Sequence, residues 1–118
     1  MARKKPKHVQ VYPPDDFNED QRSIWALINQ RRRQVLIHST LYYRLDKIIV
    51  PDRQFDRWAY ELVDLQRQYP EISETVPYHK DAFKAFDGTT GFDLPIEDPE
   101  ALRKANMIYE YYDSHRGR

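Results

Sequence analysis

The sequence has 118 residues, enough for one domain with a modest core. Lys and Arg number 19 together, as do Asp and Glu, and this balance gives no general reason to expect a nucleic-acid partner. Cysteine is absent, which excludes disulfides, thiolate metal sites and a cysteine nucleophile.

The ends of the sequence carry charge but no apolar run. A membrane span needs about 18 consecutive apolar residues, which the sequence does not contain. The N-terminal stretch "MARKKPKH" also lacks the apolar core of a signal peptide. We therefore expect a cytoplasmic protein, with residues 1–17 as a basic, proline-rich extended arm and residues 114–118 as a basic tail.

The first predicted helix begins after Asn18 and ends near residue 45. Asn18 is a typical N-cap residue, and Gln21 stands at the capping-box position. Three arginines at positions 31–33 interrupt the apolar stripe, and we expect them to form a solvated face with one stem over apolar surface. Apolar residues otherwise recur with helical spacing: Ile24, Trp25, Ile28, Val35, Leu36, Tyr42 and Leu45.

The second predicted helix begins near Pro51 or Asp52. Proline is tolerated at a helix start, and an aspartate suits the positive end of the helix dipole. Gln54 stands where a capping box would place it, and Pro70 ends the helix. Because the connection between the two helices is short, we expect them to lie antiparallel.

The remaining segment is less regular. "YHKDAFKAF" predicts one or two helical turns, and "DGTTGFDLP" predicts a turn. A last helix then begins with Asp98 as its N-cap and Pro99 at its first position. The sequence therefore predicts an all-α fold with two long antiparallel helices, an irregular segment and a C-terminal helix.

No catalytic or metal-binding pattern is present. The four histidines are scattered, and no pair has metal-ligand spacing on one helix face. The sequence also lacks the glycine-rich phosphate-binding motifs and the serine-nucleophile motif. We therefore predict no catalytic residue and no metal.

Aromatic and acidic residues converge where the two long helices meet. Tyr42 and Tyr43 lie in the last turn of the first helix, while Asp52, Phe55 and Asp56 share one face of the second. Aromatic rings attract a flat cationic ring, and carboxylates accept hydrogen bonds from hydroxyl or amide groups. Spacing alone leaves two alternatives open: a packed helix junction, or a pocket for oxidised nicotinamide ribose.

A phosphate on such a ligand would need a cation nearby. Arg44, Arg53 and Arg57 are close enough in sequence to meet it.

The same stretch resembles the N-terminal helical domain (the Ia domain) of bacterial NAD-dependent DNA ligases. The sequence "YYRLDKIIVPDRQFD" from position 42 and the later "YPE" match the family pattern in register, within residues 20–72. Two positions differ, since Tyr43 stands where many members have histidine and Phe55 where tyrosine is usual. The resemblance implies that Tyr42 and Phe55 stack on nicotinamide, while Tyr43, Asp52 and Asp56 contact the ribose, carboxamide or phosphate.

The resemblance also implies what the chain lacks. We recognise no adenylation domain, no reactive lysine of that domain and no OB-fold, so we expect a stand-alone protein that is not a ligase by itself. Residues 18–72 would form a ligase Ia-like helical hairpin. Residues 73–113 would be an irregular segment plus a closing helix, added by this protein over surface that the missing domain leaves bare.

Two functions follow as predictions. The first is a non-catalytic binding module for nicotinamide nucleotides (NMN or NAD), an accessory to DNA replication or repair that acts alone or in trans with a ligase catalytic chain. The second is a helical interaction or regulatory protein of phage or mobile-element type that has lost nucleotide binding. Trp58 and the tyrosine-rich last helix would then supply its anchors. Neither function involves a membrane or direct contact with nucleic acid.

Overall fold

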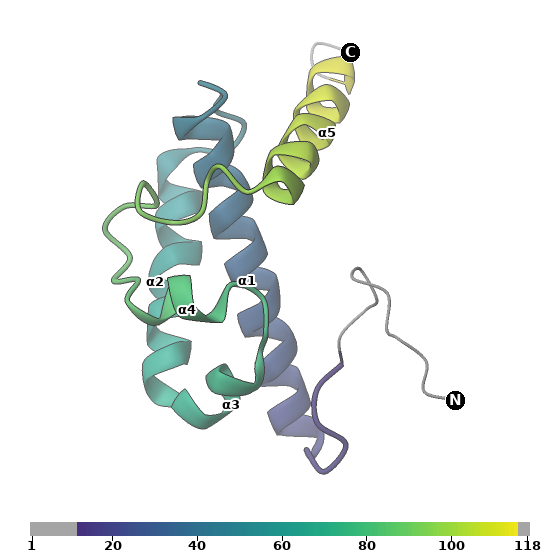
Figure 1. Cartoon of the computed structure of the whole chain (residues 1–118), viewed down its shortest axis with the longest axis vertical. Helices are drawn as coiled ribbons and strands as arrows, with labels where there is room; N and C mark the ends of the chain where they lie inside the picture. The colour runs from purple at the N-terminus through teal and green to yellow at the C-terminus, as the bar shows by residue number, and fades with distance from the viewer. Residues whose placement is uncertain (1–11, 116–118) are drawn as a thin grey trace.

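The computed structural model describes residues 12–115, and within them the fold is all-α without a strand (Figure 1). The predicted fold class is therefore confirmed. Most of the predicted basic arm (residues 1–11) and the end of the predicted tail (residues 116–118) lie outside the described residues. The helices are α1 (Glu19–Tyr43), α2 (Asp52–Gln68), α3 (Pro70–Thr75), α4 (Lys80–Lys84) and α5 (Pro99–His115).

The start and end of α1 follow from local chemistry. The Asn18 side chain accepts a hydrogen bond from the Gln21 N–H at 2.8 Å, and the Gln21 side chain accepts one from the Asn18 N–H at 2.9 Å. The predicted capping box is therefore confirmed. After Tyr43 the chain turns through Asp46, which has a positive φ of 56°, a conformation that aspartate tolerates better than most residues.

Helix α2 begins at Asp52 as predicted, but its cap differs from the prediction. Its N-cap is Pro51, which makes no side-chain capping bond. Proline has neither a side-chain acceptor nor an N–H for Gln54 to bind, so the predicted capping box is wrong. The N–H groups of Gln54 and Phe55 donate instead to the Pro51 carbonyl, at 3.0 and 3.2 Å.

The later helices are partly as expected. Helix α2 ends before Pro70 as predicted, but Pro70 also begins α3, a short helix that the sequence analysis missed. Proline suits a first helical position because the missing N–H would have no partner there. Helix α4 is the expected short helical segment. The Asp98 cap is confirmed, since Asp98 Oδ2 accepts from the Ala101 N–H at 3.0 Å.

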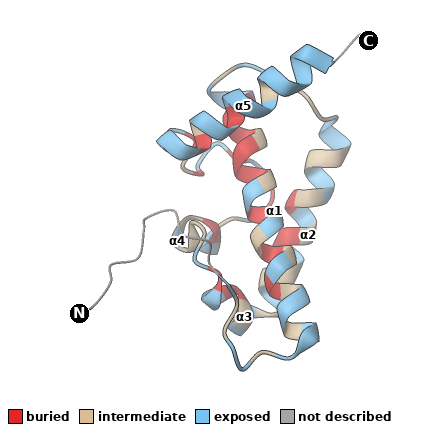
Figure 2. Ribbon diagram, turned by 90° about the vertical axis from the view of Figure 1, so that its right-hand side faces the viewer, coloured by how far each residue is buried: buried red, intermediate tan, exposed pale blue. Residues whose placement is uncertain are grey.

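Helix α1 is the central element of the molecule. Helix α2 runs back alongside it, and α3 and α5 also pack against it (Figure 1). From Val35 to Leu41 almost every residue of α1 is buried, because α2, α5 and the segment before α5 surround this half (Figure 2). The core residues are Trp25, Ile28, Val35, Leu36, Ile37, Leu41, Ala59, Leu62, Val76, Phe83, Leu94, Ile96, Ala101 and Ala105.

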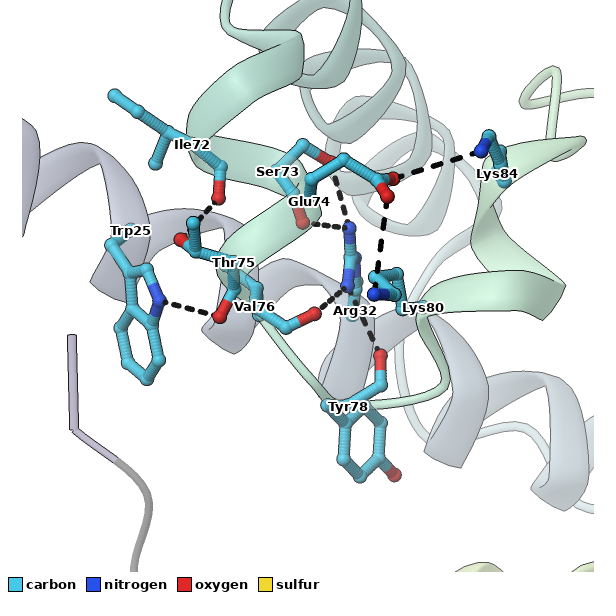
Figure 3. Close-up of polar contacts among 10 residues, drawn as sticks. All are labelled: Trp25, Arg32, Ile72, Ser73, Glu74, Thr75, Val76, Tyr78, Lys80 and Lys84. Atoms are coloured by element: carbon cyan, nitrogen blue, oxygen red, sulfur yellow. Dashed lines mark hydrogen bonds and ion pairs between the residues drawn. The ribbon is translucent and has the colours of Figure 1, made fainter. Parts of the chain in front are cut away.

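The three arginines at positions 31–33 do not form a solvated face as predicted. Arg31 donates to Glu61 Oε1 at 2.7 Å, and only Arg33 is exposed, with its guanidinium 4.2 Å from the centre of the Tyr78 ring. Arg32 is buried, and its guanidinium points at the chain that follows α3 (Figure 3).

Neutral oxygen atoms satisfy the buried guanidinium of Arg32. It donates to Gln66 Oε1 at 2.9 Å, to the carbonyls of Val76, Tyr78 and Ser73 at 2.8, 3.2 and 3.1 Å, and to Ser73 Oγ at 2.7 Å. Burial lowers the pKa of Arg32 to about 10, while the nearby Glu74 carboxylate opposes this shift. The side chain therefore stays charged at neutral pH.

None of the helices in residues 12–115 is long and apolar enough to cross a lipid bilayer.

Candidate functional site

A pocket of about 180 Å³ lies where α1 ends and α2 begins. Its walls come from the last turns of α1, the connection to α2, the first turns of α2 and two threonines that follow α4. All five residues predicted to contact the nucleotide base, ribose or phosphate line this one pocket: Tyr42, Tyr43, Asp52, Phe55 and Asp56. Their predicted contacts with a ligand remain predictions.

The two tyrosines at the pocket are not core residues. Tyr42 is 51% exposed and Tyr43 is 38% exposed, and their ring centres lie 4.8 Å apart in an edge-to-face arrangement. Phe55 is half-buried and packs against the core. Part of each tyrosine side chain therefore remains accessible beside the pocket.

The two carboxylates at the pocket have no bonding partner among the described residues. Asp52 and Asp56 are exposed, and neither makes a hydrogen bond or an ion pair within the described residues. Each therefore keeps its oxygen atoms free to accept hydrogen bonds.

His38 lines the pocket as a neutral ring. Its ring centre lies 5.2 Å from that of Trp58, and burial lowers the pKa of His38 to about 4. At neutral pH the ring carries no charge, so it offers a ligand polar nitrogen atoms but no cation.

Lys47 supplies the positive charge in the pocket lining. Its ammonium lies 4.7 Å from the centre of the Tyr109 ring, which holds it between the α1–α2 connection and α5. The arginines named from the sequence do not take this place. None of Arg44, Arg53 and Arg57 lines the pocket, and Arg44 instead approaches Glu97 at 3.7 Å.

The sequence analysis missed several lining residues. Ser39 lies three and four positions before the two tyrosines, so helical spacing would have placed it on the same face. Thr89 and Thr90 belong to the predicted turn, and nothing local to that turn indicates that it folds back to the pocket. The missed lining residues are His38, Ser39, Lys47, Ile48, Ile49, Val50, Thr89 and Thr90.

Comparison with known proteins identifies the segment that carries the pocket. Residues 21–75 match a family model described as DNA ligase-like, N-terminal NAD+-binding domain. This segment is similar to the N-terminal NAD+-binding domain of DNA ligases. The predicted resemblance is therefore confirmed, and we call residues 21–75 the Ia-like segment.

Two full-length DNA ligases share this similarity over short stretches. The chain is 30% identical to the DNA ligase of Thermosipho africanus (strain TCF52B) over 70 residues, which are 58% of the chain and 10% of that ligase. It is 42% identical to the DNA ligase of Cellvibrio japonicus (strain Ueda107) over 45 residues, 38% of the chain and 7% of that ligase. The chain thus spans a tenth or less of the length of these relatives. No solved structure matches it.

The pocket crosses the boundary of the Ia-like segment. All five predicted site residues lie inside the segment, together with Lys47 and Ser39, whereas Thr89 and Thr90 lie beyond its last matched residue. One wall of the pocket therefore belongs to a part of the chain that the ligase family model does not cover.

Proposed function

We propose that the chain is a non-catalytic binding module for nicotinamide nucleotides, and that the pocket at the α1–α2 junction takes nicotinamide mononucleotide or that half of NAD+. The main support is that exposed aromatic rings and unengaged carboxylates face one pocket, inside a segment whose family is described as NAD+-binding.

The residue chemistry suits the oxidised nicotinamide ring. A pyridinium is flat and positively charged, so aromatic faces and nearby carboxylates both attract it. We propose that Tyr42 and Phe55 stack on this ring. Tyr43, Asp52 and Asp56 then accept or donate hydrogen bonds at the carboxamide, the ribose hydroxyls or the phosphate.

The size of the pocket favours half of a dinucleotide. Pockets that enclose a drug-sized ligand usually measure roughly 300–1,000 Å³, whereas this pocket measures about 180 Å³. A site of this size and openness should bind weakly, with a Kd between high micromolar and millimolar, about 4–5 kcal/mol.

We assign no catalytic residue to the chain. In our proposal any adenylylation is performed by a separate ligase catalytic chain, to which this protein presents the nicotinamide half of NAD+ in trans.

The test is a two-dimensional NMR titration of the protein with nicotinamide mononucleotide, NAD+ and AMP. Shifts should move at the pocket with the first two ligands and not with AMP. Asp56→Ala and Tyr42→Ala should abolish the response. Asp64→Ala and Tyr111→Ala are matched controls, because both residues are exposed and neither lines the pocket. No response at several millimolar nucleotide would refute the proposal.

A second function, an interaction protein that has lost nucleotide binding, draws support from α5. Most of α5 is exposed (Figure 2), and its exposed large side chains include Met107, Ile108, Tyr111 and Tyr112, with Tyr111 68% exposed. Aromatic side chains and methionine are enriched at protein interfaces. Trp58 fits this role less well, because it is half-buried against His38.

The partner in this second function is a ligase catalytic chain or another protein, and the ligase catalytic chain is the one to test first. It predicts that such a chain binds the protein without nucleotide, and that Tyr111→Ser weakens this binding. Asp64→Ser is again the control, and binding that Tyr111→Ser leaves unchanged would count against a role for α5.

A further inference from the structure

A short segment beyond the Ia-like segment closes one side of the pocket. We call residues 87–92 the strap. It follows α4, and its threonines Thr89 and Thr90 line the pocket opposite the helix ends. Buried side chains flank it on both sides, Phe83 before it and Leu94 after it, so both of its ends are fixed to the core.

The strap lies unusually close to α1 and α2. A Cβ atom added to Gly91 would stand 1.8 Å from Ser39 Oγ, so only glycine fits there. Gly88 has a φ of +89°, and a Cβ added to it would lie 3.1 Å from the Tyr60 ring. Inside the strap the Asp87 carboxylate accepts from the Thr89 N–H at 3.0 Å and from its hydroxyl at 2.7 Å. The strap therefore packs closely against both helices.

The strap also contacts a predicted ligand-binding residue. The hydroxyls of Tyr43 and Thr90 are 2.8 Å apart, and the rings of Tyr43 and Phe92 meet edge to face with centres 5.3 Å apart. Thr90 Oγ1 already accepts from the Phe92 N–H at 3.1 Å. The Tyr43–Thr90 bond uses only one of the two hydroxyl hydrogens, so this pair keeps one O–H free to donate to a ligand.

A second hydroxyl beside the strap lacks a partner. Ser39 is 1% exposed and lines the pocket, and its Oγ makes no hydrogen bond within residues 12–115. A buried hydroxyl without a partner is unfavourable, and Gly91 of the strap packs directly against this one.

We propose that the strap is a built-in second wall of the nucleotide pocket, which holds the ribose 5′-phosphate part of nicotinamide mononucleotide through the Tyr43–Thr90 hydroxyl pair. The chain thereby encloses the ligand between its Ia-like segment and its own strap. This inference rests on the proposed function, and it adds a binding group from outside the segment that the ligase family shares.

The test compares the affinity of the full chain for nicotinamide mononucleotide and for nicotinamide by NMR titration. Thr90→Val keeps the shape of the side chain and removes its hydroxyl. It should weaken mononucleotide binding about tenfold or more, as expected for the loss of one hydrogen bond to a charged phosphate, and should leave nicotinamide binding unchanged. Thr75→Val is the matched control, since its hydroxyl bonds to the Ile72 carbonyl in α3, outside the pocket.

The outcomes separate this inference from the proposed function. One outcome is that Asp56→Ala abolishes binding while Thr90→Val binds the mononucleotide as tightly as the unchanged protein. The proposed function would then hold, and our inference that the strap takes part in binding would be overturned. If Thr90→Val binds more tightly, the strap obstructs the pocket and our inference is overturned. If the unchanged protein binds no nucleotide, both proposals fail together.

Discussion

At the scale of single residues, Arg32 shows how one buried charge organises a segment that has little regular structure. A guanidinium has five N–H donors, and in this protein each of them meets an oxygen atom. Three of these atoms are backbone carbonyl oxygens of residues 73–78, at the end of α3 and just after it. Arg32 therefore supplies hydrogen-bond donors to a stretch of backbone where helical structure ends.

We expect Arg32→Met to destabilise the protein by about 3 kcal/mol, because several buried carbonyls lose their donor while most of the side-chain volume is kept. Urea denaturation measures this change. Arg57→Met is the control, since Arg57 is exposed and should change stability by no more than about 0.5 kcal/mol. Equal effects of the two substitutions would show that the hydrogen bonds of Arg32 contribute nothing to the free energy of unfolding.

His38 should make stability depend on pH. Burial lowers its pKa from 6.5 to about 4, so between these values the unfolded chain binds more protons than the folded one. Stability should therefore fall as the pH drops from 7 to 5, by about 2 kcal/mol from this residue alone. The difference between the unchanged protein and His38→Gln in urea denaturation at the two pH values isolates this contribution. His115→Gln, at an exposed position, should keep the full pH dependence.

At the scale of elements, the pocket exists because three pieces of the chain meet. The end of α1 and the start of α2 are neighbours through their short connection, but the strap is brought to them by burial of Phe83 and Leu94. Its contact with α1 depends on the absence of a side chain at Gly91. The geometry of the pocket thus depends on a close approach between segments about 50 residues apart.

Gly91→Ala should destabilise the protein by about 1–3 kcal/mol, because the added methyl group would overlap Ser39 Oγ. Ser39→Ala should recover part of this loss in the double variant, since it removes the overlapping atom. Thermal unfolding of the two single variants and the double variant measures the coupling. Strictly additive effects would contradict the close approach of the strap to α1.

At the scale of the whole molecule, α1 connects the two halves of the structure. One end of it, near Trp25 and Arg32, holds α3 and the segment that follows, where the Trp25 indole N–H donates to the Thr75 carbonyl at 3.3 Å. The other end packs against α5 and forms the pocket. Binding at the pocket should therefore stabilise the whole chain and not a single element.

Nicotinamide mononucleotide at about ten times its Kd should raise the free energy of unfolding by about 1.4 kcal/mol. For a domain of this size that amounts to an increase in Tm of several degrees. Differential scanning fluorimetry measures the shift, with AMP at the same concentration as the control. A shift that is the same for both nucleotides would reflect nonspecific binding.

Features that depend on neighbouring residues could be predicted from the sequence. The Asn18 and Asp98 caps, the break before Pro70 and the convergence of Tyr42 with Asp56 follow from helical spacing and from bonds across three or four residues. Such interactions form between groups that the chain holds close together in any fold. The all-α class and the group of residues around the pocket were therefore predictable.

Features that depend on distant segments could not be predicted and became visible in the folded chain. Arg32 is buried because carbonyls more than 40 positions later turn towards it, and Thr90 reaches Tyr43 across 47 positions. Lys47 lines the pocket while Arg44 does not, because the turn at Asp46 redirects the chain between them. These contacts depend on how the core packs, and no pattern of neighbouring residues encodes that packing. The position of the strap beside the pocket therefore could not be predicted from the sequence.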